Sequence, residues 1–213
     1  PARRAPPRQR AMARKVLRPP PAYPGMTVGL FGGTFDPPHA GHRNVSDMAL
    51  KRLGLDRLWW LVTPGNPLKD RADMTKLKKR LKRVRKFVRH PRVDVTGFEA
   101  ALPNAYSAET IAFLVNRYPA VRFVWIMGAD NLASFHRWHL WREILWTMPV
   151  AVFDRPGYRH AAMSAPAVVS FARYRVDESD AAGLWRYRAP AWMLLTLPLS
   201  PLSSTQLRDG DGK

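Results

Sequence analysis

The sequence predicts a single doubly wound α/β domain with a parallel sheet, and three observations support this. Short apolar runs alternate along the chain with segments of helical periodicity, which is the order that produces a parallel sheet covered on both faces. The runs at residues 58–62 and 121–127 are predominantly apolar, as is typical of strands buried on both sides. The length of 213 residues, with 46% of them hydrophobic, is enough for one such domain with a substantial core.

The expected strands are apolar or alternating runs bounded by Gly, Pro, Asp or Asn. In chain order they cover residues 27–31, 58–62, 93–98, 121–127, 150–153 and 192–197. Adjacent glycines permit a tight turn, so Gly32 and Gly33 are expected to stop the first strand.

The expected helices have an apolar stripe or a helix-start signal. They cover residues 40–53, ending at Gly54; 75–90; a helix opening at Tyr106 with Ser107 as N-cap; short helices around Trp138, Trp141 and Ile144; 164–175; and a terminal helix opening at 203–208.

The segment after the first strand carries the strongest chemical signal. It reads Gly-Gly-Thr-Phe-Asp-Pro-Pro-His-Ala-Gly-His from Gly32 to His42. The glycines leave main-chain N–H groups open to a ligand, and the Asp-Pro-Pro loop leads into a helix with proline at its first positions. His39 and His42 are three residues apart and share a face of the first turn. A helix N-terminus attracts phosphate, and two imidazoles there can bind or protonate it at neutral pH.

Two further segments offer groups for a phosphorylated, aromatic ligand. Ser203-Ser204-Thr205-x-x-Arg208 places three hydroxyls at a helix start and an arginine in the next turn, all able to hold phosphate oxygens. The segment from Gly128 to Trp138 combines Asp130, which can accept hydrogen bonds from ribose hydroxyls, with a tryptophan that can stack on a heterocycle. Both segments could instead have a purely structural role. The first would then be an N-cap followed by a surface arginine, and the second would supply aromatic core residues, as Phe135 and the nearby Trp141 are expected to do. His136 and His139 give only a weak indication of a metal site, because the chain has no cysteine and Asp130 is the one acid close by.

Taken together, the motifs resemble those of the HxGH nucleotidyltransferase superfamily, whose signatures are His-x-Gly-His and Ser-Ser-Thr-x-x-Arg. The longer Gly-Gly-Thr-Phe-Asp-Pro-Pro-His-x-Gly-His form and the Gly-x-Asp-x-x-x-x-Phe-His-x-Trp block resemble those of bacterial nicotinate mononucleotide adenylyltransferases, a family of NAD synthesis. Three shorter blocks are also similar to that family: Asn66-Pro67-x-Lys69, Tyr106-Ser107, where the family commonly has Thr after Tyr, and Arg155-Pro156-Gly157-Tyr158. The blocks run from Gly29 to Arg208.

The resemblance implies a Rossmann-like domain that transfers AMP from ATP to nicotinate mononucleotide, giving deamido-NAD and pyrophosphate by direct in-line attack. It implies three sets of site residues. The catalytic set is His39, His42 and Arg208. The ATP-binding set is Gly32, Gly33, Thr34, Phe35, Ser203, Ser204 and Thr205. The substrate-binding set is Asn66, Lys69, Tyr106, Ser107, Asp130, Trp138 and Arg155. Mg²⁺ is expected to enter with ATP, held mainly by phosphates and water, and no protein metal site is expected.

Two alternatives remain at this point. One is an adenylyltransferase for another acceptor, such as nicotinamide mononucleotide or phosphopantetheine. The other is a nucleic-acid-binding protein, because the formal net charge is +19, from 35 Lys and Arg against 16 Asp and Glu, and a polyanionic ligand fits such a charge. That second class leaves the histidine and serine motifs unexplained, so nucleic acid is not expected as the main ligand.

Residues 1–25 are expected to form a separate tail ahead of the domain at 26–213. They contain seven Arg or Lys, no acid and a run of three prolines, which suits a disordered basic segment. They lack the apolar region of a secretory signal, and no apolar run in the chain is long enough to span a membrane. We therefore expect a cytoplasmic protein with no membrane partner.

Overall fold

The computed structural model describes residues 18–64, 73–155 and 157–197. Six strands form one sheet in the order β3-β2-β1-β4-β5-β6, and every neighbouring pair is parallel. The strands are β1 (Thr27–Gly33), β2 (Arg57–Val62), β3 (Val93–Thr96), β4 (Arg122–Gly128), β5 (Val150–Phe153) and β6 (Trp192–Leu195). The predicted doubly wound α/β class is confirmed, because this is the strand order of dinucleotide-binding sheets.

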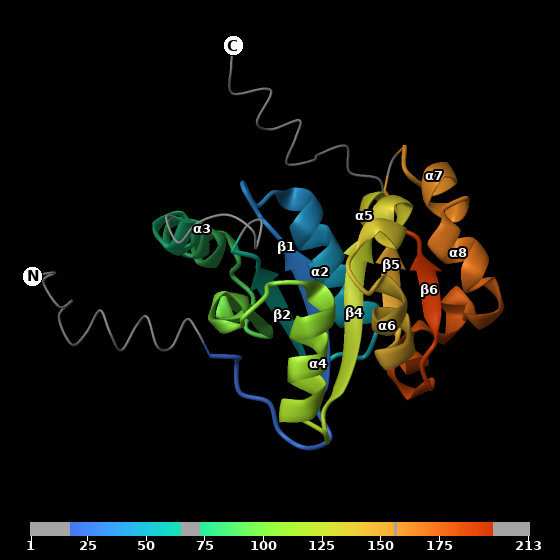
Figure 1. Cartoon of the computed structure of the whole chain (residues 1–213), viewed down its shortest axis with the longest axis horizontal. Coiled ribbons are helices and arrows are strands. Elements are labelled where there is room, and N and C mark those ends of the chain that lie inside the picture. The colour runs from blue at the N-terminus through green and yellow to red at the C-terminus, as the bar shows by residue number, and fades with distance from the viewer. Residues whose placement is uncertain (1–17, 65–72, 156, 198–213) are drawn as a thin grey trace, which may run out of the picture.

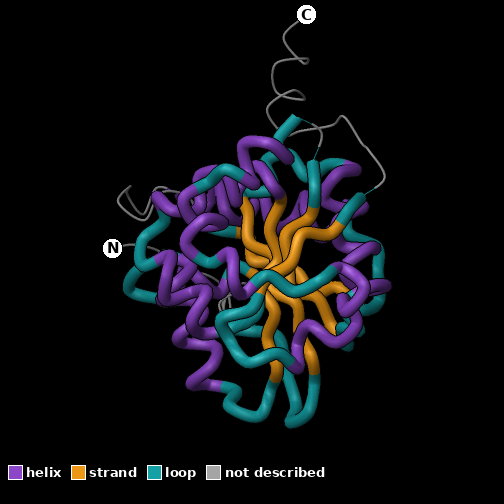
Figure 2. Tube along the Cα trace, turned by 90° about the vertical axis from the view of Figure 1, so that its right-hand side faces the viewer, coloured by secondary structure: helices purple, strands orange, loops and turns teal. Residues whose placement is uncertain are grey.

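Helices cover both faces of the sheet (Figures 1 and 2). The α-helices are α2 (Ala40–Arg52), α3 (Asp73–Phe87), α4 (Ser107–Arg117), α5 (Ala129–Ser134), α6 (Trp141–Thr147), α7 (Arg159–Met163) and α8 (Pro166–Ser170). The 3₁₀ helices are η1 (Phe98–Ala101), η2 (Phe135–Arg137), η3 (Ala172–Tyr174) and η4 (Glu178–Arg186). One core cluster joins the sheet to α4, α5, α6 and α8, and the other joins it to α2, α3 and η4.

The connections between the strands create a switch point at the carboxyl ends of β1 and β4. From the central β1 the chain moves outward to β2 and β3, then returns to β4 on the other side of β1. The loops that leave the carboxyl ends of β1 and β4 therefore diverge, and doubly wound sheets bind their ligands in the crevice at such a point. The His-x-Gly-His segment follows β1, and the segment from Gly128 to Trp138 follows β4.

Three local predictions near this switch point were wrong. Gly32 and Gly33 do not stop the first strand. They are the last two residues of β1, and both pair with β2. Asp36-Pro37-Pro38 forms the predicted loop, but neither proline is at the first helical positions, because α2 begins at Ala40 after the N-cap His39. The N-cap of α4 is Tyr106 rather than Ser107, which is the first helical residue, and no side chain caps that end.

Other differences lie away from this switch point. The strand expected at 93–98 ends at Thr96, and η1 begins at Phe98. The helix expected at 164–175 is divided into α8 and η3. Helices α7 and η4 were not predicted. The terminal helix expected at 203–208 lies outside the described residues.

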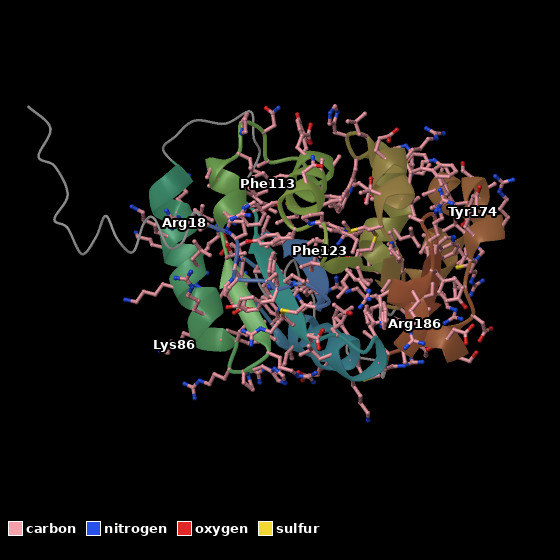
Figure 3. The ribbon with its side chains drawn as sticks, turned by 90° about the horizontal axis from the view of Figure 1, so that it is seen from below. Arg18, Lys86, Phe113, Phe123, Tyr174 and Arg186 are labelled. Carbon is pink, nitrogen blue, oxygen red and sulfur yellow. The ribbon has the colours of Figure 1, made fainter. Side chains whose placement is uncertain are left out.

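Residues 18–25, assigned to the tail from the sequence, run along the body of the domain. The carbonyl of Pro20 accepts a hydrogen bond from the Tyr118 hydroxyl at 3.2 Å, and the Gly25 N–H donates to the Ala120 carbonyl at 2.8 Å. Arg18 lies on the α3 side of the molecule, as Lys86 does (Figure 3). The tail boundary at residue 25 stays a prediction. Among the described residues, no helix has the length and apolar character needed to cross a membrane.

Candidate active site

His39 and His42 are locked together at the N-terminus of α2. His39 is the N-cap, in extended conformation, and its Nδ1 accepts a hydrogen bond from the Gly41 N–H at 3.1 Å. Nδ1 of His42 accepts from the His39 N–H at 3.2 Å, and the two ring centroids are 3.8 Å apart. This is the reciprocal geometry of a capping box, built here from two imidazoles. The spacing of three residues therefore fixes both rings against the start of the helix.

These hydrogen bonds decide which nitrogen carries the proton. A neutral imidazole has one donor and one acceptor nitrogen, and Nδ1 is the acceptor in both rings. The proton is therefore on Nε2 in both. Nε2 of His39 is buried and has no hydrogen-bond partner among the described residues. The pair thus supplies N–H donors beside the carboxyl end of β1.

Both histidines are neutral at pH 7. Burial lowers the pKa of His39 from 6.5 to about 4, with a further lowering by the Arg155 charge and an opposing effect of Asp130. Burial also lowers the pKa of His42 to about 3, helped by His39 and Arg155. Neutral imidazoles donate hydrogen bonds without transferring a proton. At these pKa values both rings are hydrogen-bond donors in the free protein, and neither carries a second proton to give at pH 7.

An aromatic cluster accounts for the burial of His42. Its ring lies 4.9 Å from Phe35, 5.8 Å from Trp60 and 6.0 Å from Phe31, measured between centroids. The Phe35 ring is 1% exposed and stacks on Trp60 at 4.4 Å. The Phe35 side chain is therefore not accessible to a ligand.

The other expected ATP-binding residues that the structure describes surround this cluster. A Cβ added to Gly33 would lie 3.2 Å from the Phe35 ring, and one added to Gly32 would lie 3.1 Å from Trp125. Both glycines thus allow large rings to pack against the end of β1. Thr34 is exposed, directly after the strand.

Asp130 and Arg155 form an ion pair that connects the ends of β4 and β5. The Arg155 guanidinium donates from Nη1 to Asp130 Oδ2 at 2.7 Å, and both side chains are about one quarter exposed, at 24% and 27%. Because both charges act on the pKa of His39, the pair lies within electrostatic reach of the histidines. The other carboxylate oxygen of Asp130 is buried without a hydrogen-bond partner among the described residues. An ion pair within electrostatic reach of the imidazoles is a suitable place for a phosphate or a ribose hydroxyl.

Trp138 and the start of α4 belong to a second group of expected substrate residues. Trp138 is half-buried and packs edge-on against Phe135 at 5.2 Å, while Phe135 and Trp141 are buried in the core as expected. The His139 ring lies 4.7 Å from the Tyr106 ring and its Nε2 is 3.3 Å from Glu109. These contacts bring the Tyr106-Ser107 block beside the block that ends at Trp138.

Six of the expected site residues lie outside the described part of the chain. They are Asn66, Lys69, Ser203, Ser204, Thr205 and Arg208. Across residues 18–64, 73–155 and 157–197, no three His, Cys, Asp or Glu side chains are grouped in a way that would hold a metal ion.

Sequence reasoning missed Arg80, which is 9% exposed and donates from Nη1 to the Thr34 carbonyl at 3.1 Å. The signal was present: Arg80 lies at helical spacing between the buried Leu77 and Val84, so an arginine occupies the apolar stripe of α3. The Lys and Arg residues around it make Arg80 resemble one more residue of a solvated face.

The sequence matches a family model described as cytidylyltransferase-like over residues 30–210. A probable nicotinate-nucleotide adenylyltransferase of Agrobacterium fabrum is 53% identical over 184 residues, which are 86% of this chain and 98% of that protein. One from Rhizobium meliloti is 55% identical over 183 residues, covering 86% of this chain and 97% of that protein.

Solved structures agree on the fold. The nicotinic acid mononucleotide adenylyltransferase of Plasmodium falciparum, complexed with NaAD, aligns with a TM-score of 0.61 at 13% identity, covering 86% of this chain and 83% of that one. The same enzyme complexed with APC aligns with a TM-score of 0.58 at 15% identity over the same shares of both chains.

Proposed function

The chain belongs to the cytidylyltransferase-like family, and from this premise we propose that it is a nicotinate-nucleotide adenylyltransferase of NAD biosynthesis. It transfers AMP from ATP to nicotinate mononucleotide and yields deamido-NAD and pyrophosphate. A phosphate oxygen of the mononucleotide attacks the α-phosphorus of ATP. The bond from that phosphorus to the oxygen bridging to the β-phosphate breaks, and its electron pair leaves with pyrophosphate.

The observation that carries this proposal is the pair of neutral imidazoles at the carboxyl end of β1. In-line transfer needs alignment of the two phosphates and stabilisation of the charge that develops on them, without a protein nucleophile. The Nε2–H groups of His39 and His42 donate to the α-phosphate and to the bridging oxygen. Donors that are already oriented stabilise developing charge at little reorganisation cost.

The remaining roles follow the nature of the side chains. Arg155 and Asp130 bind the acceptor, the arginine through its phosphate and the carboxylate through ribose hydroxyls. Trp138 stacks on the pyridine ring, and Tyr106 and Ser107 line the same region.

The residues outside the described ranges complete the proposal. Arg208, with the hydroxyls of Ser203, Ser204 and Thr205, binds the triphosphate, and main-chain groups from Gly32 to Phe35 bind it as well. Asn66 and Lys69 contact the acceptor.

Mg²⁺ accompanies ATP and neutralises part of the triphosphate charge. Asp130 is paired with Arg155, and the described residues hold no group of three metal-ligating side chains. Phosphate oxygens and water would supply most of its ligands, because Mg²⁺ usually keeps several waters and binds substrate phosphates. Both substrates are small phosphorylated molecules, so neither a membrane nor nucleic acid takes part in the reaction, and we propose a cytoplasmic enzyme.

The test is pyrophosphate release with ATP and Mg²⁺, comparing nicotinate mononucleotide with nicotinamide mononucleotide and phosphopantetheine. A strong preference for the nicotinate form is expected, because main-chain N–H groups near Trp138 can bind its carboxylate. Equal rates with both mononucleotides would widen the acceptor range. No release with any of the three would leave only the family assignment.

A further inference from the structure

The basic helix α3 stands against the loop that precedes the two histidines. Its stripe of Leu77, Leu81 and Val84 is buried in the same core cluster as Phe35 and Trp60. Arg80 lies on that stripe and its guanidinium bonds the carbonyl of Thr34, the first residue after β1. A nearly buried arginine is rare unless it is paired. The hydrogen bond to Thr34 therefore distinguishes Arg80 from the solvated Lys and Arg side chains of the same helix.

Two further contacts connect α3 to the same segment. Nη1 of Arg83 donates to Oδ1 of Asp36 at 2.9 Å. From the other side, Nη2 of Arg43, the residue after His42, donates to the Phe87 carbonyl at 3.1 Å, and its guanidinium lies 4.6 Å above the Phe87 ring. The helix is thus bonded to the start of the loop, to its middle, and to the residue that follows the second histidine.

The loop requires such support because its backbone is strained. Phe35 has a φ of 47°, a left-handed conformation that is unfavourable for a bulky side chain. Its ring is fixed between Trp60 and His42, and Arg80 holds the carbonyl of the preceding residue. A loop released from Arg80 would be free to relax, and the His39 N-cap lies only four residues beyond Phe35.

We propose that Arg80 is a positioning residue for the adenylyl transfer, and that α3 acts as a clasp that holds the segment from Thr34 to Arg43 in its active geometry. This inference rests on the proposed function for its kinetic consequence only. It also assigns a role to part of the basic helix: Arg80 and Arg83 bond to the loop after β1, whereas Lys78, Lys79 and Lys82 are exposed.

The test compares Arg80→Met with Lys82→Met, which removes the same charge from an exposed position of the same helix. For Arg80→Met we expect kcat to fall about tenfold or more, with KM for both substrates changed less, because misplacement of catalytic groups acts on turnover. Amide hydrogen exchange provides a readout without substrate. The N–H groups of His39 and Gly41, which bond the two Nδ1 atoms, should exchange faster in Arg80→Met and at wild-type rates in Lys82→Met.

The outcomes separate this inference from the proposed function. If the wild-type protein does not transfer AMP, the proposed function fails and the exchange rates still test the clasp. Wild-type exchange in folded Arg80→Met would overturn the inference, even if KM for ATP rose, because Arg80 would then act only through its charge. If Arg80→Met does not fold, the same measurements are made on Arg83→Met, which changes an exposed side chain. That variant should show faster exchange at His39 and a kcat lowered about two- to fivefold, and wild-type values of both would overturn the inference.

Discussion

Nδ1 of His42 accepts a hydrogen bond from the main-chain N–H of His39, so the orientation of the second imidazole depends on the backbone that carries the first. The rings are 3.8 Å apart, and His39 is bonded in turn to Gly41, between the two histidines. The pair therefore behaves as one unit. Substitution of either histidine is expected to disturb the other, and the effects of the two substitutions will not add.

The first prediction concerns His42→Ala. Loss of one oriented donor to a developing charge is expected to lower kcat by about 10²–10³-fold, while circular dichroism shows an intact fold. His160→Ala, at an exposed position of α7, is the matched control and should leave kcat unchanged. Turnover at the wild-type rate in His42→Ala would remove this imidazole from the mechanism.

The second prediction concerns protonation of the pair in the free protein. Because burial lowers the pKa of His39 to about 4 and of His42 to about 3, their NMR signals should not titrate between pH 6 and 8, where an unperturbed histidine has its midpoint. The sign for stability follows. The unfolded chain binds these protons more readily, so the contribution of the two histidines to the free energy of unfolding should decrease as the pH falls from 6.5 toward 4. An imidazole midpoint near pH 6.5 for either residue would contradict both expectations.

The third prediction uses the ion pair beside the histidines. Arg155 lowers the pKa of His39 and Asp130 raises it. Arg155→Met should therefore move the pKa of His39 upward, and Asp130→Asn should move it downward. An NMR titration of both variants measures the two shifts. Shifts of equal sign would show that a structural change, and not the removed charge, dominates.

The sequence predicts the sheet and the histidine site well because these depend on local patterns. The uniformly apolar residues 58–62 are almost entirely buried in β2, and the spacing of His39 and His42 alone places both rings at one helix start. Contacts between distant segments could not be predicted. Nothing near Thr34 in the sequence indicates that its carbonyl pairs with Arg80, because that contact depends on how α3 packs against β2.

Some errors have a clear physical reason. Residue type predicts that Gly32 and Gly33 end the first strand, but here the missing Cβ makes room for the rings of Trp125 and Phe35. Residue type predicts Ser107 as the N-cap, but the N-cap is Tyr106, so Ser107 is the first helical residue and its hydroxyl is not in the capping position. At the two glycines, packing of the aromatic rings outweighs the tendency of glycine to end a strand. At Ser107, the predicted N-cap is wrong by one residue.

The fourth prediction tests the acceptor side of the site through Trp138. Its ring is half-buried and edge-on to Phe135, so Trp138→Phe keeps an aromatic face while Trp138→Ala removes it. Trp138→Ala is expected to raise KM for nicotinate mononucleotide by about tenfold, the value of one ring-stacking contact, with KM for ATP little changed. Trp138→Phe should recover most of the affinity. An equal rise of KM for both substrates would mean that the ring supports the fold of the site and does not stack on the acceptor.

The fifth prediction concerns Glu99, a carboxyl group in η1 that is 2% exposed. Its Oε1 accepts from the Thr110 hydroxyl at 2.9 Å, and its Oε2 is buried without a partner among the described residues. Burial raises the pKa of Glu99 from 4.5 to about 7, against the opposing hydrogen bond from Thr110. Because the folded state holds this proton more tightly than the unfolded chain, the stabilisation is complete below pH 4.5 and is lost as the pH rises through about 7.

Comparison of the wild type with Glu99→Gln isolates this effect, since the histidine contributions are the same in both proteins and cancel. Between pH 5 and pH 8 the wild type should lose about 2 kcal/mol of unfolding free energy relative to Glu99→Gln, measured by urea denaturation at each pH. Glu143→Gln, at an exposed position of α6, should follow the wild type at both. If Glu99→Gln also follows the wild type, then the carboxyl group is ionised at no cost when folded, and its buried oxygen must have a partner in solution.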